Sequence, residues 1–165
     1  MKKTMLCIVS FALMLVSLSA SVDKGRGAQF GKEAPTLVVE RADSATSLQA
    51  LKGKKVILSF WSAADAQSRI EQNRIASLTA DAAGNHKDFE VLSVNFDRSE
   101  RLMNEIVKID NLDSSSQCHV GNADNAAAIR EAFSMKNSLR TFIIDEKGRI
   151  VCADPTEQQL LEVIG

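Results

Sequence analysis

The sequence predicts one α/β domain with a mixed central sheet and helices on both of its faces. Short β-branched runs alternate with helical patterns along residues 33–165. A strand–helix–strand order early in this range implies a parallel strand pair with a right-handed crossover. A hairpin near the end must be antiparallel, so the predicted sheet is mixed.

Length and composition fit a single globular domain. The chain has 165 residues, of which 45% are hydrophobic and 25% charged, enough for one core of ordinary size. The formal net charge is -1. No basic cluster indicates a nucleic-acid surface, and no repeat or second linker divides the chain.

The first 20 residues have the layout of a secretory signal peptide. Lys2 and Lys3 precede an apolar run over 5–18, and small residues follow up to Ala20. The alternative is a membrane anchor, but a helix of that run spans about 21 Å, against about 30 Å for a bilayer core. We therefore predict cleavage near Ala20 and export from a bacterial cell into the periplasm or the extracellular space. Cleavage removes two lysines and no acids, which changes the net charge from -1 to -3, and leaves no stable membrane span.

The first half of the mature chain is predicted to hold a flexible segment, three strands and a helix. Residues 21–32 are glycine-rich and are expected to be flexible. Strands are predicted at 37–39, 56–61 and 89–96. A helix is predicted from about residue 65 to 82, ended by a Gly-Asn pair. Its apolar residues, assigned to the buried face, are Ala66, Ile70, Ile75, Leu78 and Ala82.

The second half is predicted to contain three helices and a hairpin. Helices are expected over 99–112 and 122–133, with a brief extended piece at 116–120 between them. The hairpin covers 140–153 and turns at a Glu-Lys-Gly sequence. Apolar residues assigned to the first of these helices are Leu102, Ile106 and Ile109.

The last helix has an N-terminal signature. Asp154 is predicted as its cap, Pro155 as its first residue and Glu157 as the partner of a capping box.

Four stretches of the chain resemble one family. They read GKEAPTL, SLQALKGKKVILSFW, SVNFD and TFIIDEKGRIV. In this order and spacing they are similar to the TlpA/ResA/DsbE group of thioredoxin-like thiol–disulfide oxidoreductases. The resemblance covers roughly residues 30–165 and implies a thioredoxin-like fold, with the redox site just after the strand that ends in Phe-Trp.

The family's redox cysteines are absent. Its Cys-x-x-Cys motif begins four residues after the tryptophan, and here Asp65 and Ser68 hold the two positions. Leu139 stands where the family has a cis-proline, and Trp61 matches the family tryptophan beside the helix start. Disulfide exchange needs a thiolate and a resolving thiol, and oxygen cannot replace either. The resemblance therefore implies the fold without the activity.

Two interpretations of this corner stay open. A carboxylate at Asp65 can cap the helix that follows, with Ser68 in reach of the same cap. Alternatively, the two side chains form a polar pocket that binds a ligand or a partner.

Two cysteines remain after signal cleavage, Cys118 and Cys152. An oxidising compartment permits a disulfide between them, or they are separate side chains. His119 follows Cys118 directly, but neighbours on a strand point to opposite faces, which speaks against an activated thiolate. His86 and His119 have no metal-ligand spacing, and we expect no metal or cofactor.

Two functions are compatible with the sequence. The first is an exported thioredoxin-like domain without thiol–disulfide oxidoreductase activity, which binds a protein or peptide or serves as a structural module. The second is a redox protein that uses Cys118 and Cys152 as a relocated thiol pair. We favour the first, because both redox cysteines of the family are replaced, and this indicates a protein that is not an enzyme.

Overall fold

The computed structural model describes residues 28–41, 44–80 and 88–165. Strands in this part are β1 (Val38–Arg41), β2 (Ser44–Ser47), β3 (Lys55–Trp61), β4 (Phe89–Asn95), β5 (Gln117–His119), β6 (Thr141–Ile144) and β7 (Ile150–Ala153). Its α-helices are α1 (Ala66–Thr79), α2 (Glu100–Ile109), α3 (Ala123–Ala132) and α4 (Glu157–Ile164), and its 3-10 turns are η1 (Leu48–Leu51) and η2 (Ser114–Ser116).

All the described strands belong to one mixed sheet in the order β2-β1-β5-β4-β3-β6-β7. β3 and β4 are parallel along their whole length, from Lys55 opposite Phe89 to Trp61 opposite Asn95. β5 continues the parallel part, whereas β1, β6 and β7 pair in antiparallel fashion. The predicted crossover between the first two buried strands is formed by α1, and the predicted mixed sheet is confirmed.

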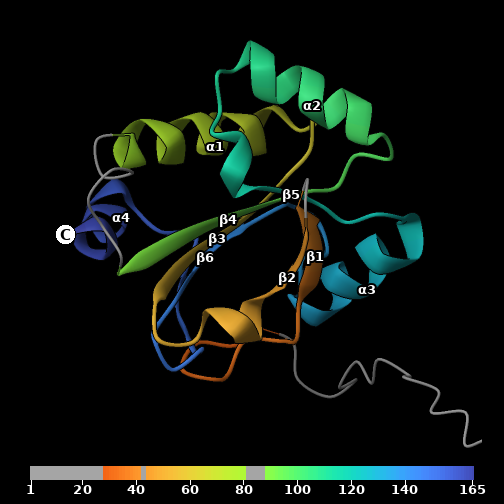
Figure 1. Ribbon diagram of the computed structural model, residues 1–165. Coiled ribbons are helices and arrows are strands. Elements are labelled where there is room, and N and C mark those ends of the chain that lie inside the picture. Colours follow the sequence, from red (N-terminus) through yellow and green to blue (C-terminus); the bar gives the residue numbers. More distant parts are fainter. Residues whose placement is uncertain (1–27, 42–43, 81–87) are drawn as a thin grey trace, which may run out of the picture.

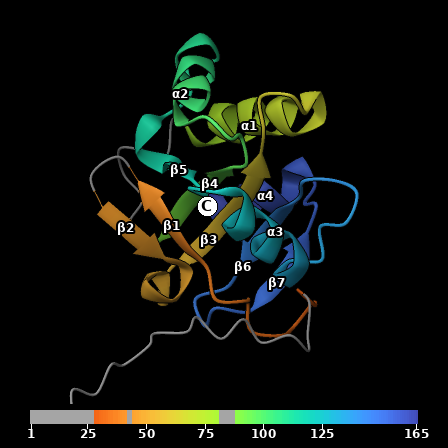
Figure 2. The ribbon, with the colours of Figure 1, turned by 90° about the vertical axis from the view of Figure 1, so that its right-hand side faces the viewer.

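Helices cover both faces of the sheet, as predicted (Figures 1 and 2). On one face, α3 packs against the largest core cluster, at whose centre Phe60, Phe133 and Phe142 meet edge to face or tilted. On the other face, α1 and α4 pack around Ile57 and Ile143. α2 lies on that same side and covers Trp61.

The buried faces of α1 and α2 differ from the prediction. Ile70 was assigned to the core, yet it is 62% exposed. The face of α1 that is turned to the sheet instead carries Ser68 and Gln72 with Ile75. Polar side chains can occupy it because Gln72 bonds to Ser59 of β3 and Ser68 bonds to main-chain groups of the loop between β3 and α1. On α2, Met103 and Val107 are buried and Ile106 packs partly buried against the same cluster, whereas Leu102 and Ile109 are exposed.

Helix α4 begins later than predicted. Thr156 is its cap and forms a capping box with Gln159. Asp154, the predicted cap, has a φ of 52° and pairs with Arg140 across the end of the hairpin. Asp154 therefore stabilises the end of the hairpin and does not cap the helix. Pro155 lies before the cap residue and not in the first turn of the helix.

The amino-terminal part of the described chain is tied to the sheet. Residues 28–32 were predicted to be flexible, but the Gly31 N–H donates to the Ile150 carbonyl at 2.7 Å and the Ile150 N–H donates to the Lys32 carbonyl at 2.9 Å. Glu33 forms a bridge with Arg149. This stretch thus lies along the outer edge of β7. Strand β2 was not predicted at all.

Several predictions fall on residues outside the described ranges: the signal peptide over 1–20, the helix end at Gly84-Asn85, and the exposed His86. Within the described ranges, no helix is long and apolar enough to cross a bilayer.

Candidate functional site at the start of helix α1

The candidate site lies at the carboxyl ends of β3, β4 and β5, where the loops that follow these parallel strands converge. Ligand sites of open α/β sheets form at such strand ends. The loop after β3 leads into α1, and the family motif places its redox cysteines at that junction.

Asp65 and Ser68 form a closed hydrogen-bonded cap. The Asp65 carboxylate accepts the Ser68 N–H at 2.7 Å, which makes Asp65 the N-cap of α1. The Ser68 hydroxyl donates to the Asp65 carbonyl at 3.0 Å and accepts the Ser62 N–H at 3.2 Å. Ser68 is only 5% exposed. These contacts agree with the helix-cap interpretation. They engage the Ser68 hydroxyl both as a donor and as an acceptor.

Asp97, which the sequence analysis did not single out, anchors this loop from the end of β4. Its carboxylate accepts the Ser62 hydroxyl at 2.8 Å and the Ala63 N–H at 2.9 Å. It also accepts the buried Asn95 side-chain amide at 2.8 Å. The SVNFD stretch contains both Asn95 and Asp97, but their role depends on a loop more than 30 residues away in the chain.

His119 supports the same corner from β5. The Gly121 N–H donates to Nδ1 at 3.2 Å, so Nε2 is the atom that carries the proton, and it lies 2.7 Å from the Asp97 carbonyl oxygen. The His119 ring thus faces the Asp97 loop. The Cys118 side chain packs into the core cluster on the opposite face of the sheet. The expectation that these neighbours point apart agrees with this placement.

Trp61 is a core residue and does not line an opening. It is 0% exposed, and its Nε1–H donates to the Gln117 Oε1 at 3.0 Å. Its indole packs with Met103 and Val107 of α2.

A buried polar chain runs under α1. The Gln72 amide donates to the Ser59 hydroxyl at 2.8 Å, and that hydroxyl lies 2.9 Å from the Thr141 hydroxyl. The three residues come from α1, β3 and β6, so this chain fixes the helix against the sheet at the level of the candidate site.

A cleft of about 360 Å³ opens beside the cap. One wall is α1, with Gln67, Ser68 and Arg74, and the other is the segment 138–141 with Pro155. Leu139 lines this cleft in the position of the family's cis-proline. None of the peptide bonds in the described ranges is cis, so the segment lacks that feature.

Cys118 and Cys152 are not brought together. Both thiols are free, Cys118 being buried in β5 and Cys152 partly buried in β7. Three strands lie between β5 and β7, which places the cysteines about 19 Å apart at the usual strand spacing. A disulfide needs Cα atoms within about 7 Å. Of the two alternatives that the sequence left open, this fold agrees with two separate cysteines and not with a disulfide.

Neither thiol is poised to react. Burial raises the pKa of Cys118, and the nearby Arg41 guanidinium only partly offsets it. Burial also raises the pKa of Cys152. A thiol whose pKa is raised has less of the nucleophilic thiolate at neutral pH, so the geometry does not support a relocated redox pair.

The described residues contain no group of three or more His, Cys, Asp or Glu side chains that could hold a metal ion.

The family model described as Redoxin matches residues 29–159. The chain belongs to the Redoxin family. This match covers every strand and all helices except the end of α4, so the resemblance inferred from four short stretches is confirmed. No curated protein matches the chain.

Solved structures agree with this assignment. A thioredoxin-like protein from Parabacteroides distasonis is 27% identical, with a TM-score of 0.68 over 84% of this chain and 96% of that one. The thioredoxin domain of a thiol-disulfide oxidoreductase from Bacteroides vulgatus is 22% identical, with a TM-score of 0.71 over 84% of this chain and 96% of that one. A thiol:disulfide interchange protein from Bacteroides sp. is also 22% identical, with a TM-score of 0.71 over 83% and 88% of the two chains. The predicted thioredoxin-like fold is thus confirmed.

Proposed function

We propose that this Redoxin-family protein is an exported thioredoxin-like binding module that performs no thiol–disulfide exchange. The proposal rests on one observation: at the two cysteine positions of the family motif, oxygen atoms of Asp65 and Ser68 are engaged in the cap of α1. Exchange requires a sulfur atom that attacks and a second that resolves, and this corner has neither.

The cleft beside the cap supports binding. It is open to solvent along α1 and mixes charge with apolar surface, since Arg74 pairs with Glu71 and Arg140 pairs with Asp154 at its walls. The exposed Ile70 lies on the same side of α1, between Gln67 and Arg74 in helical order. A segment of a partner protein with polar and apolar side chains would suit this surface. Export is supported by the signal-like first 20 residues.

The absence of exchange activity can be tested by insulin reduction with dithiothreitol. The mature chain should not accelerate precipitation of the insulin B chain above the background. The double variant Asp65→Cys, Ser68→Cys is the positive control, because it restores two sulfur atoms at a helix start, where a thiolate is stabilised. We expect it to gain activity. Turnover by the unmodified chain at the rate of a thioredoxin would contradict the proposal.

Binding can be tested with displayed random peptides selected on the mature chain. Enriched peptides should lose affinity at least tenfold when Ser138→Trp fills the cleft. Asn137→Trp is the matched control, because Asn137 is exposed in the same loop but does not line the cleft. Equal loss in both variants, or no enriched peptide that is sensitive to Ser138→Trp, would argue for a purely structural module.

A further inference from the structure

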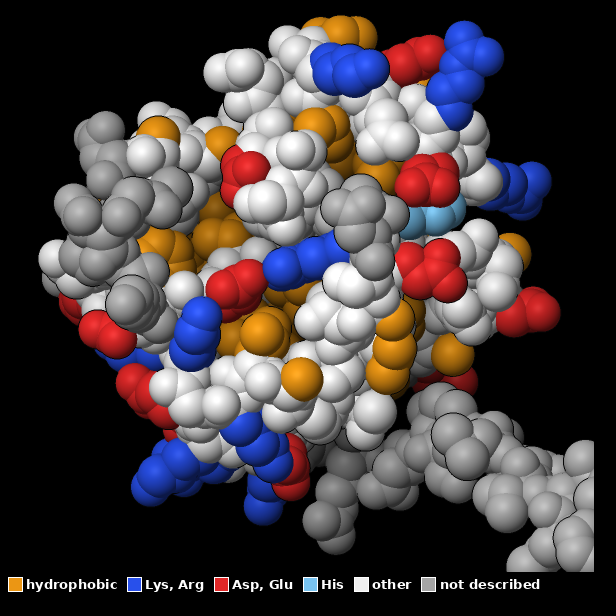
Figure 3. Space-filling model, in the orientation of Figure 1, with side chains coloured by type: hydrophobic (Ala, Val, Ile, Leu, Met, Phe, Trp, Pro, Cys, Tyr) orange, Lys and Arg blue, Asp and Glu red, His pale blue; other side chains and the backbone are white. Residues whose placement is uncertain are grey.

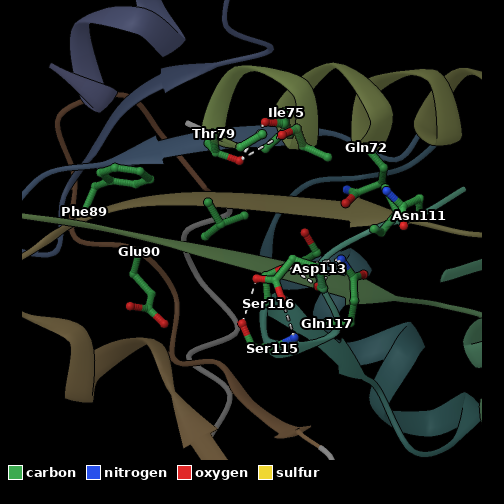
Figure 4. A pocket seen from close by; sticks show the side chains of 15 residues that line it. Gln72, Ile75, Thr79, Phe89, Glu90, Asn111, Asp113, Ser115, Ser116 and Gln117 are labelled. Atoms are coloured by element: carbon green, nitrogen blue, oxygen red, sulfur yellow. Dashed lines mark hydrogen bonds between the residues drawn. The ribbon is translucent and has the colours of Figure 1, made fainter. Parts of the chain in front are cut away.

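A second cleft, of about 500 Å³, lies between α1, β4 and the segment 111–117 (Figure 4). It is formed by the carboxyl-terminal half of α1 and shares no lining residue with the cleft beside the cap. Its size is in the range of small-molecule sites. Nothing in the proposed binding function uses it.

Two largely buried side chains face this cleft with an oxygen that has no hydrogen-bond donor in the described part of the chain. Ser93 of β4 is 1% exposed, lines the cleft, and makes no hydrogen bond through its hydroxyl to any residue in the described ranges. Gln72 is 2% exposed. Its amide N–H is used by Ser59, but its Oε1 accepts no hydrogen bond from the described part of the chain. Among the described residues, the enclosed side-chain polar atom without a partner is Arg41 Nε; the Ser93 hydroxyl and the Gln72 Oε1 are instead open to the cleft, where an occupant can supply donors to both.

The main chain of β4 adds an acceptor and a donor. β5 pairs with β4 only from Ser93 onward, so Val91 has a described partner strand on the β3 side alone. The Val120 N–H donates to the Asn95 carbonyl across the β4–β5 edge. Main-chain groups alternate sides along a strand, so Val91 presents its N–H and carbonyl toward the same edge. Val91 lines the cleft.

The remaining lining fixes the apolar and electrostatic character of an occupant. Ile75, Phe89 and Leu112 provide apolar walls, and Glu90 and Asp113 provide carboxylates. No lysine or arginine is among the lining residues, and the Glu90 carboxylate is already paired with Arg41 at 3.0 Å and with Lys54 at 3.6 Å. Figure 3 shows hydrophobic side chains in a hollow that acidic and basic side chains border. The lining therefore offers an anion no unpaired cation, and it suits a neutral molecule with a compact apolar body.

We propose that this cleft binds a small neutral carboxamide with an aromatic or aliphatic body. The carboxamide N–H groups donate to the Gln72 Oε1 and the Ser93 hydroxyl. Its carbonyl oxygen accepts the Val91 N–H. The apolar body lies between Ile75 and Leu112. A carboxamide matches this set because it carries donors and an acceptor on one planar group without charge.

Three probes of one shape test the proposal: benzamide, benzoate and benzamidinium. Each is titrated to about 10 mM into the ¹⁵N-labelled mature chain and followed by two-dimensional NMR. Benzamide should bind with a Kd of about 1 mM, the range expected for a ligand of about nine non-hydrogen atoms, and should shift the amide signals of Val91, Ser93 and Gln117. Benzoate lacks donors and carries a negative charge, and benzamidinium lacks the acceptor. Both should bind at least tenfold more weakly.

Variants identify the groups that recognise the carboxamide. Ser93→Ala should weaken benzamide at least threefold. Ser115→Ala is the matched control: its hydroxyl lines the same cleft but is already paired with Asp113, so the affinity should stay unchanged. The amide spectrum of each variant reports whether it folds. Shifts confined to residues outside the cleft, equal binding of benzoate, or unchanged binding to Ser93→Ala would each overturn the proposal.

Discussion

Replacing Asp97 tests whether one carboxylate holds the degenerate redox corner together. Asp97→Ala removes the acceptor for three donors: the Ser62 hydroxyl, the Ala63 N–H and the Asn95 amide. Asn95 is fully buried, so its orphaned amide costs about 1–3 kcal/mol. The other two donors lie nearer to solvent and lose about 0.5–1.5 kcal/mol each. We expect a loss of about 3 kcal/mol in the free energy of unfolding.

The assay is urea unfolding followed by far-ultraviolet circular dichroism, which reports on the whole domain. Asp97→Asn should cost less than Asp97→Ala, because one oxygen can still accept the Ser62 and Ala63 donors. The matched control is Asp113→Ala, another aspartate that accepts a main-chain N–H in a loop but is exposed. A loss for Asp97→Ala no larger than for Asp113→Ala would refute the anchoring role.

Three further predictions concern single side chains. Asp65→Ala should lower the free energy of unfolding by about 1 kcal/mol, and Asp65→Asn by less, because asparagine also caps helices; equal losses in urea unfolding would argue against a cap. Burial acts to raise the pKa of Asp145, but hydrogen bonds from the main chain and guanidinium of Arg149 outweigh it and lower the pKa below its ordinary value of 3.8. The stabilisation of the folded state that results is complete above the unfolded-state pKa and is lost as the pH falls through the folded-state pKa. Asp145→Asn should therefore have a lower free energy of unfolding at pH 7, and that free energy should fall less steeply below about pH 4. An acid-unfolding profile equal to that of the unmodified chain would contradict this. Ser93→Ala should raise the free energy of unfolding of the ligand-free chain by up to about 1 kcal/mol, because it removes a largely buried hydroxyl that has no protein partner among the described residues; a thermal midpoint below that of the unmodified chain would contradict this.

The sequence predicted an element correctly where the residues of an apolar run also form the core of the fold. The runs at 56–61 and 89–96 predicted two buried strands, and the structure pairs them in parallel. β2 was missed because its sequence, Ser-Ala-Thr-Ser, has neither an apolar face nor a strand-forming run. It is held as a strand by pairing with β1.

The candidate site was predictable in position but not in its contacts. The count from Phe-Trp placed Asp65 and Ser68 at the helix start, and the structure confirms the cap. The anchoring by Asp97 and the partners of Gln72 depend on loops and strands that are distant in the chain. Apolar spacing also misassigned Ile70, because it ignores polar residues such as Gln72 that are satisfied by their neighbours.

The main-chain bonds that residues 31–34 make with the outer edge of β7 bear on self-association of the chain through that edge. An uncovered strand edge invites pairing with another copy of the same chain. Here the cover is supplied by residues 31–34, which precede β1, and stretches outside regular secondary structure are common sites of proteolytic cleavage. Cleavage up to Pro35 would uncover this edge of β7, and the exposed edge would then favour strand pairing between copies of the chain.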